Sequence, residues 1–365
     1  MLLTPNLDSV WRGKEGFQVI DSFKQLINKI GLPRLTIILF LVALLIIASV
    51  NRLPTSMLLS NSLVRIGMNG VMVLAMVPSV QSGAGLNFGL SIGIIAGLIG
   101  MLVVMEFELM GFLGLITALL IACVLGAAAG YLYGLILNRV RGQEMMIGTY
   151  AGFSIVSGMC MFWLLAPFKN PEMIWVVGGK GLRMTLAVND SLAKILDNLW
   201  KFKILGVEIP VGLLLAFALA CLFLEVFFRS RLGVSMKIAG ANPAFATSCG
   251  VNVDKMRVLG TVLSTALGAM GMVIYCQSFG YVQLYMAPLM MSFPAVAAVL
   301  IGGASARKAT VWNAVLGTAL FQTLLTISLP VTRSMIQGDI SEVAKTIISN
   351  TMILYALTRK EGDGE

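Results

Sequence analysis

The sequence of 365 residues contains no histidine and is poor in charge. Charged residues make up 12% of the chain, whereas hydrophobic residues make up 58%. Without imidazole the chain lacks the usual metal ligand and the usual proton carrier at neutral pH. The low charge and high apolar content exclude an ordinary soluble globular domain. We therefore expect an all-α integral membrane protein.

Sites for nucleotide hydrolysis and catalysis are also missing. No GxxxxGK[ST] phosphate loop occurs, because Gly178-Gly179-Lys180 lacks the spacing. No Ser/His/Asp set, HExxH motif or pair of carboxylates within a span is visible. We predict no catalytic residue, no cofactor and no metal site. No acidic residue lies at mid-depth, where a proton-driven carrier needs one, and Arg65 is assigned a structural or pore-lining role.

The five cysteines and the net charge of +9 carry little functional signal. The cysteines show no CxxC spacing, so we interpret them as small packing residues. The basic residues are scattered over loops and form no aromatic-studded face. Such charge is typical of topology signals and attraction to anionic lipid, and it predicts no nucleic-acid partner.

Apolar runs long enough to cross a hydrocarbon core of about 30 Å recur along residues 35–358. We predict about ten spans, with a range of eight to eleven, in one transmembrane domain over residues 35–358. The spans are expected near 35–51, 58–82, 86–105, 109–138, 145–166, 207–228, 257–279, 288–304, 313–330 and 342–358.

An even number of spans places both termini on the same side. The segments predicted to be cytoplasmic are 1–34, 139–144, 229–257, 305–312 and the tail 359–365. Together they hold sixteen of the 26 basic residues, as the positive-inside rule requires of cytoplasmic loops. The predicted external loop 167–206 holds six more, but long loops largely escape that rule.

Two segments outside the spans show helical apolar spacing. The first lies within residues 1–34 and predicts an amphipathic helix on the cytoplasmic surface, with a solvated tail as the alternative. The second lies in the loop 167–206 and predicts a short helix on the outer membrane surface, where a substrate-delivery protein would dock. An inert connector is the alternative there. The residues of the two apolar faces are Phe23, Leu26, Ile27 and Ile30, and Leu192, Ile195, Leu196 and Leu199.

Glycine-rich stretches predict broken helices near mid-membrane. Residues 83–93 contain four glycines, and irregular backbone at that depth is tolerated only where it is buried in protein or lines a wet cavity. A looser counterpart lies between residues 277 and 305. Paired breaks in two halves indicate a central pathway, although the polar residues there could instead form hydrogen bonds between helices. The residues assigned to the translocation path are Asn69, Gln81, Asn87, Ser91 and Gln277.

The longest polar interruption in the second half is the hairpin 229–257. It carries five basic residues against one acid, which favours the cytoplasmic side. Gly240-Ala241-Asn242-Pro243 breaks it into two short helices, and the small residues up to Gly250 would leave room for a docking partner. The sequence thus combines membrane spans, a hydrated path and a docking hairpin, and it lacks a site for nucleotide hydrolysis. This combination predicts the permease subunit of an importer that a separate ATPase drives.

Three segments of the hairpin resemble a known motif. RLG at 231–233, AGANPAFA at 239–246 and SCGVNVDK at 248–255 resemble "RxG…ALGGNPEAARxSGINVxK". This motif belongs to permeases of ABC importers for ribose, galactose and related simple sugars. AAVLIGGAS at 297–305 resembles the "AIAAVVLGGTS" segment of that family, and the similarity runs in order from about 35 to 358. The family commonly reads "GIDLSVGS" after the second span, whereas GLNFGLSIG at 85–93 lacks the acid.

The resemblance implies a multi-pass protein of the bacterial inner membrane. Its expected partners are a cytoplasmic ABC ATPase, a second permease subunit, identical or not, an external substrate-binding protein and membrane lipid. The implied cargo is a simple sugar, with nucleosides, a furanosyl signal molecule or a polyol as alternatives, and an ion-driven secondary carrier is the rival interpretation. The hairpin 231–255 would form the coupling helices. The residues that the resemblance assigns to ATPase coupling are Arg231, Gly233, Gly240, Ala241, Asn242, Pro243, Ala246 and Gly250.

Overall fold

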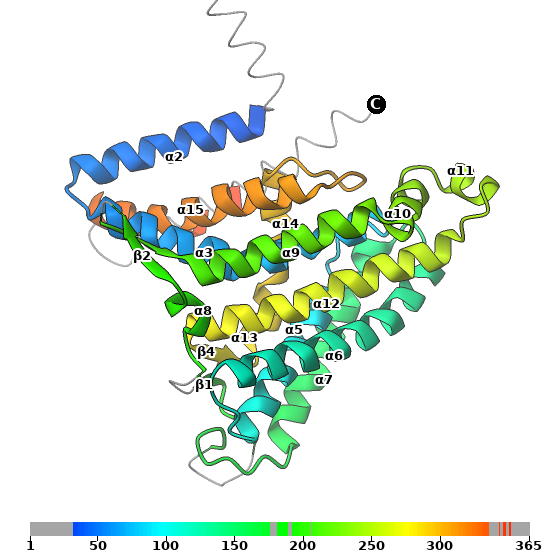
Figure 1. The fold of residues 1–365 in the computed structure, drawn as a ribbon, viewed down its shortest axis with the longest axis horizontal. Helices are drawn as coiled ribbons and strands as arrows, with labels where there is room; N and C mark the ends of the chain where they lie inside the picture. Colours follow the sequence, from blue (N-terminus) through cyan, green and yellow to red (C-terminus); the bar gives the residue numbers. More distant parts are fainter. Residues whose placement is uncertain are drawn as a thin grey trace, which may run out of the picture.

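The computed structural model describes residues 32–175, 181–188, 192–204 and 206–335, together with helical residues 343, 346, 347, 350 and 351 (Figure 1). The predicted surface helix before residue 32 and the tail 359–365 lie outside the described residues. Most of the predicted tenth span, 342–358, lies outside them as well.

Six apolar helices in the described part are long enough to cross a membrane. The first consists of α3 (Thr55–Leu74) and α4 (Met76–Gln81), which follow each other directly. The other five are α6 (Gly111–Arg139), α7 (Glu144–Leu165), α9 (Val211–Arg229), α12 (Val253–Phe279) and α15 (Val311–Met335). Shorter apolar helices are α2 (Leu32–Val50), α5 (Leu90–Glu106), α13 (Met286–Met290) and α14 (Ser292–Ile301). These elements coincide with nine predicted spans, and the count of ten is not confirmed.

The centre of the protein is built on α5 and α12. The α5 sequence LSIGIIAGLIGMLVVME has no polar face, and a helix that is apolar all round must be covered by protein or lipid. Almost all of its side chains are buried in the protein, and it packs against α6 and α12. By contrast, α6 exposes large apolar side chains such as Leu113 and Val124, as a lipid-facing helix does.

The predicted external loop contains short strands that a purely helical fold does not include. β1 (Thr185–Ala187) pairs antiparallel with β4 (Tyr281–Gln283), and β2 (Lys201–Ile204) pairs with β3 (Val207–Pro210). The span predicted from residue 207 therefore begins only at Val211, after β3.

The prediction of an amphipathic helix on the outer membrane surface is wrong. The described loop contains one four-residue helix, α8 (Ile195–Asn198). Leu192 and Leu196 are buried inside the protein, because the loop backbone is tied to the end of α12. The backbone N–H groups of Lys194 and Leu196 donate to the backbone and side-chain oxygens of Gln277 at 2.7 and 3.3 Å.

Contacts sort the connections between helices into two ends of the molecule. At one end, here called the hairpin end, lie α10 (Arg231–Ala241), α11 (Pro243–Ser248) and the turns 82–89, 139–143 and 302–310. The other end, here called the loop end, holds residues 51–54 and 107–110 and the described residues of the segment 166–210. Figure 1 shows α10 and α11 on the right and β1, β2 and α8 on the left, with α6, α9 and α12 running between them.

Hydrogen bonds between distant segments support this sorting. At the hairpin end, Gln81 Nε2 donates to the carbonyl of Ala309 at 2.6 Å. At the loop end, Asn51 Nδ2 donates to Ser334 Oγ at 2.9 Å, and Glu208 N donates to Ser60 Oγ at 2.7 Å. This is the alternation that the predicted order of spans requires up to residue 335.

Candidate functional site

The hairpin between α9 and α12 forms the two short helices that the sequence predicts. Each helix start has its own side-chain cap. Ser230 Oγ accepts from Gly233 N at 3.2 Å, Asn242 Oδ1 accepts from Phe245 N at 3.0 Å, and Asn252 Oδ1 accepts from Lys255 N at 3.0 Å. Such caps satisfy amide donors that the first helical turn leaves free. The chain therefore sets the boundaries of α10, α11 and α12 locally.

The residues assigned to ATPase coupling divide into a buried and an exposed set. Gly233 and Ala246 are buried, and Gly240 is half-buried. The exposed members are Arg231, Ala241, Asn242, Pro243 and Gly250.

Gly240 is small because it contacts the protein itself. A Cβ at this position would collide with the carbonyl oxygen of Gln81 and lie 2.8 Å from the amide nitrogen of Gly83. Gly83 has φ of 79°, in the left-handed region that favours glycine. The end of α10 thus rests directly on the corner where α4 ends. The expectation that small residues at 240 and 246 leave room for a partner is corrected, since both face inward.

The same corner is enclosed from the side of α12. A Cβ at Gly260 would collide with the side chain of Ser82 and lie 2.8 Å from the carbonyl oxygen of Pro78. On the α12 side the main chain meets the Ser82 side chain and the Pro78 carbonyl, whereas on the hairpin side main chain meets main chain. This close packing couples the hairpin to the first broken helix without intervening side chains.

Two ion pairs join residues 139–144, which comprise the α6–α7 turn and the first residue of α7, to the start of α12. Arg141 pairs with Asp254, and both side chains are 56% exposed. Arg257 pairs with Glu144 at 2.6 Å, with side chains only 11% and 18% exposed. The second pair is largely desolvated, so its attraction is screened little by water.

The irregular backbone predicted after α4 is present, but it connects α4 to α5 at the hairpin end and does not interrupt a span near mid-membrane. The backbone between Gln81 and Leu90 is irregular, and Asn87 and Ser91 lie at its end with 2% of each residue exposed. Asn87 Nδ2 donates to Ser264 Oγ of α12 at 2.8 Å. Ser91 Oγ donates to the carbonyl of Pro288 at 2.6 Å and lies 2.9 Å from Ser292 Oγ. The first break therefore contacts the second interrupted segment, α13 and α14.

The five residues assigned to the translocation path do not meet at one point. Asn87 and Ser91 share the irregular segment after α4, whereas Gln81 bonds the residue two positions before α15 and Gln277 bonds the loop-end segment at α8. Asn69 Nδ2 donates to the carbonyl of Arg65 in its own helix at 3.0 Å. In the isolated subunit, four of them form hydrogen bonds between segments.

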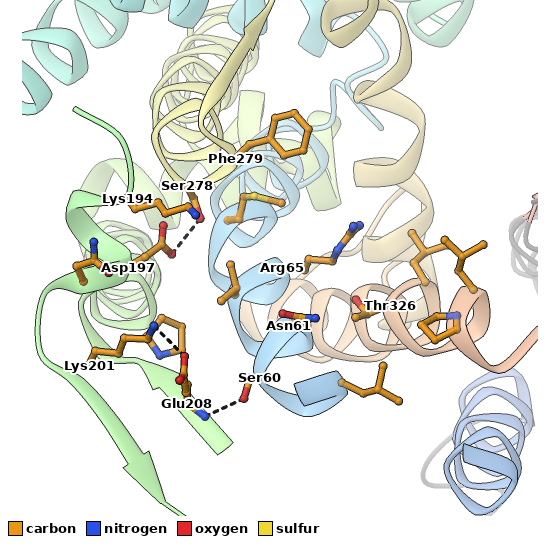
Figure 2. Close-up of a pocket in the computed structure, with 18 residues that line it drawn as sticks. Ser60, Asn61, Arg65, Lys194, Asp197, Lys201, Glu208, Ser278, Phe279 and Thr326 are labelled. Carbon is orange, nitrogen blue, oxygen red and sulfur yellow. Dashed lines mark hydrogen bonds and ion pairs between the residues drawn. The ribbon is translucent and has the colours of Figure 1, made fainter. Parts of the chain in front are cut away.

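A pocket of about 600 Å³ opens at the loop end (Figure 2). Its walls come from α3, the end of α12, α15 and the segment around α8. Figure 2 shows Arg65 and Asn61 projecting from α3 on the side of Thr326, with Asp197 and Lys194 on the other side of α3. The charged residues in the lining are Arg65, Lys194, Asp197, Lys201 and Glu208.

The Asp197 carboxylate is only 8% exposed and takes part in one hydrogen bond, from Ser278 Oγ to Oδ1 at 3.0 Å. Its Oδ2 is buried without a hydrogen-bond partner among the described residues. Burial raises the pKa of this carboxyl above its usual value, while the Ser278 hydrogen bond and nearby Lys194 and Lys201 oppose the rise. Glu208 is different: the Lys201 ammonium, 2.8 Å away, lowers its pKa.

Residues 58–357 match the family described as "Branched-chain amino acid transport system / permease component". The chain belongs to this family. The match covers both broken segments, the hairpin and the pocket residues named above. Membership in this permease family agrees with the apolar helices of the fold.

Relatives of the chain differ in the substrates that their names state. The chain is 26% identical over 184 residues to the nucleoside ABC transporter permease protein NupC of Lactococcus lactis, covering 48% of this chain and 54% of the relative. It is 25% identical over 146 residues to the tyrosine transport system permease protein of Clostridioides difficile, covering 38% and 48%. It is 24% identical over 243 residues to the high-affinity branched-chain amino acid transport system permease protein LivH of Salmonella typhimurium, covering 53% and 79%.

The chain thus spans about half the length of the nucleoside and tyrosine permeases. No solved structure matches it.

Several residues of the candidate sites escaped the sequence reasoning. Glu144 and Asp197 find their partners 113 and 81 positions away, and no local pattern marks such pairs. Phe245 is 56% exposed at the tip of the hairpin. A large apolar residue within a polar turn was the signal that could have identified it.

Proposed function

We propose that the chain is the membrane-spanning permease subunit of an ATP-driven importer of a small polar solute. A separate ABC ATPase docks on the α10–α11 hairpin and supplies the energy. The observation that carries this proposal is the main-chain contact of Gly240 with residues 81–83, where α4 ends. Through that contact, a force applied to the hairpin reaches the break directly.

The exposed face of the hairpin suits a protein partner. Phe245 and Leu232 are 56% and 54% exposed, and Arg231 and Lys237 stand among them. Aromatic anchors with basic neighbours are enriched among residues that dominate binding energy. A shallow pocket of about 390 Å³ lies beside α11, between Pro243 and Arg141, and could receive a protruding side chain of the partner.

The remaining assembly follows from the same proposal. The hairpin end faces the bacterial cytoplasm, and the loop end faces the external substrate-binding protein. A second permease subunit completes the membrane portion. Segment 82–89 and the interrupted segment 280–291, which contains β4 and the short α13, frame the path. The irregular backbone of 82–89 suits a hydrated route, because backbone without helical bonds needs polar surroundings.

The cargo class is a small polar solute. The resemblance in the hairpin favours a simple sugar, whereas relatives in the family carry names for nucleosides, tyrosine and branched-chain amino acids. A nucleoside is therefore an alternative within the same importer class. An ion-driven carrier is disfavoured, because no carboxylate was found at mid-depth in the sequence.

The docking assignment is tested by co-purification from native membranes after mild cross-linking. Phe245→Ser removes the apolar anchor without touching the protein interior, and Phe202→Ser, at an equally exposed residue of the loop end, is the matched control. We expect wild type and the control to elute with an ATP-hydrolysing subunit, and the Phe245 variant to retain about a tenth as much, the loss that about 1.4 kcal/mol produces. Wild-type protein that elutes without ATPase activity would refute the proposal.

A further inference from the structure

The charges around the loop-end pocket are balanced except for one. On the side of α8, Lys201 pairs with Glu208, and the same carboxylate lies 3.8 Å from Lys203. The buried Asp197 lies within electrostatic reach of Lys194. These charges compensate one another within the lining. Arg65 is different, because no ion pair or side-chain hydrogen bond joins its guanidinium to another described residue.

Arg65 is exposed to the pocket, and the only partner within electrostatic reach among the described residues is the phenol of Tyr275, which offers no full counter-charge. Arg65 is ten residues after Thr55, the first residue of α3, which corresponds to about 15 Å along the helix axis. A charged side chain at such depth is rare, and it usually lines a water-filled cavity or pairs with another charge. Figure 2 shows that Arg65 and Asn61 project on the same side of α3, facing the α15 residue Thr326.

A guanidinium presents several fixed N–H donors and recognises carboxylate or phosphate groups in a bidentate manner. Asn61 is exposed next to it and carries both a donor and an acceptor. We propose that the loop-end pocket binds a small solute through an anionic group held by Arg65, with Asn61 as a second polar contact. The solute is an organic anion or a zwitterion carrying a carboxylate.

This inference rests on the proposed import function, and it narrows the cargo from neutral, hydroxyl-rich solutes to charged ones. The pocket is large enough for a molecule of amino-acid size.

The test is chemical labelling of the variant Asn61→Cys in phosphatidylcholine vesicles, with reagent on both sides of the membrane. Two water-soluble methanethiosulfonates are compared, one carrying a sulfonate and one a trimethylammonium group. Modification of the introduced thiol is followed by mass spectrometry of the peptide that contains it, and each rate is divided by the rate with glutathione. We expect the sulfonate reagent to be favoured, and Arg65→Met to reduce its preference about tenfold, as removal of a unit charge a few ångströms away predicts.

Arg65→Lys keeps the charge and should retain most of the preference. Arg52→Met is the matched control, because it removes an exposed positive charge from the same end but outside the pocket lining. The proposal is overturned if Arg65→Met leaves the preference unchanged, if Arg52→Met lowers it equally, or if neither reagent modifies the introduced thiol. Labelling requires no ATPase, so its outcome is independent of the co-purification result.

Discussion

Residues 139–144, between α6 and the start of α7, form two ion pairs with α12 whose energetic effects should differ because of burial alone. Arg257–Glu144 and Arg141–Asp254 join the same two segments, one largely buried and the other half exposed. The perturbations are Glu144→Gln and Asp254→Asn, which remove one negative charge each at nearly constant volume.

The expected magnitudes differ by severalfold. Glu144→Gln leaves the Arg257 guanidinium desolvated and without its counter-charge, and such a loss costs about 3 kcal/mol of unfolding free energy. Arg257 Nε already has no hydrogen-bond partner among the described residues, so the charge has little local compensation. Asp254→Asn removes an exposed pair worth at most about 1 kcal/mol, plus a few tenths from the first turn of α12.

The assay is a denaturant titration in detergent micelles, followed by tryptophan fluorescence. A large loss for Glu144→Gln and a small one for Asp254→Asn support the reasoning. Raising the salt concentration should weaken the exposed pair and leave the buried one nearly unchanged. Equal losses for the two variants would refute the argument, because burial would then have no effect on either pair.

Further predictions concern packing, titration and the central break. Gly317→Ala would drive a Cβ into the carbonyl of Ala298 and should cost about 3 kcal/mol or prevent folding, whereas Gly158→Ala, in open space on α7, should be neutral or slightly stabilising in the same titration. Because the pKa of Asp197 is raised in the folded state, its ionised form weakens folding, so Asp197→Asn should gain stability relative to wild type as pH rises above the ordinary carboxyl pKa of about 4; a gap independent of pH would contradict this. Ser91→Ala removes two hydrogen bonds between the broken segments and should lower the unfolding free energy by about 1 to 2 kcal/mol, with Ser157→Ala, whose hydroxyl bonds only its own helix, as the reference.

The positions of the long helices could be predicted because an apolar run carries its own signal. The span expected at 109–138 is α6 at Gly111–Arg139, and the one at 145–166 is α7 at Glu144–Leu165. The hairpin was equally predictable, since Asn242 before Pro243 and Asn252 before α12 are local caps. In each case the cause lies within a few residues of the effect.

The contacts between distant segments were not predictable in this way. The small residues of the hairpin suggested an open surface, but Gly240 is small because its main chain contacts Gln81. The apolar face of Leu192 and Leu196 suggested a membrane surface, but the protein interior covers it. Composition shows that a residue is small or apolar and does not show what covers it.

The contact of Gly240 with the corner 81–83 has a consequence for how motion passes through the molecule. Long side chains at an interface can absorb a small displacement by changing rotamer, but two touching main chains have no such slack. A shift of α10 by about an ångström should therefore displace residues 81–83 by nearly the same distance. Chimeras that exchange α10 with a relative should accordingly need the matching corner transferred with it.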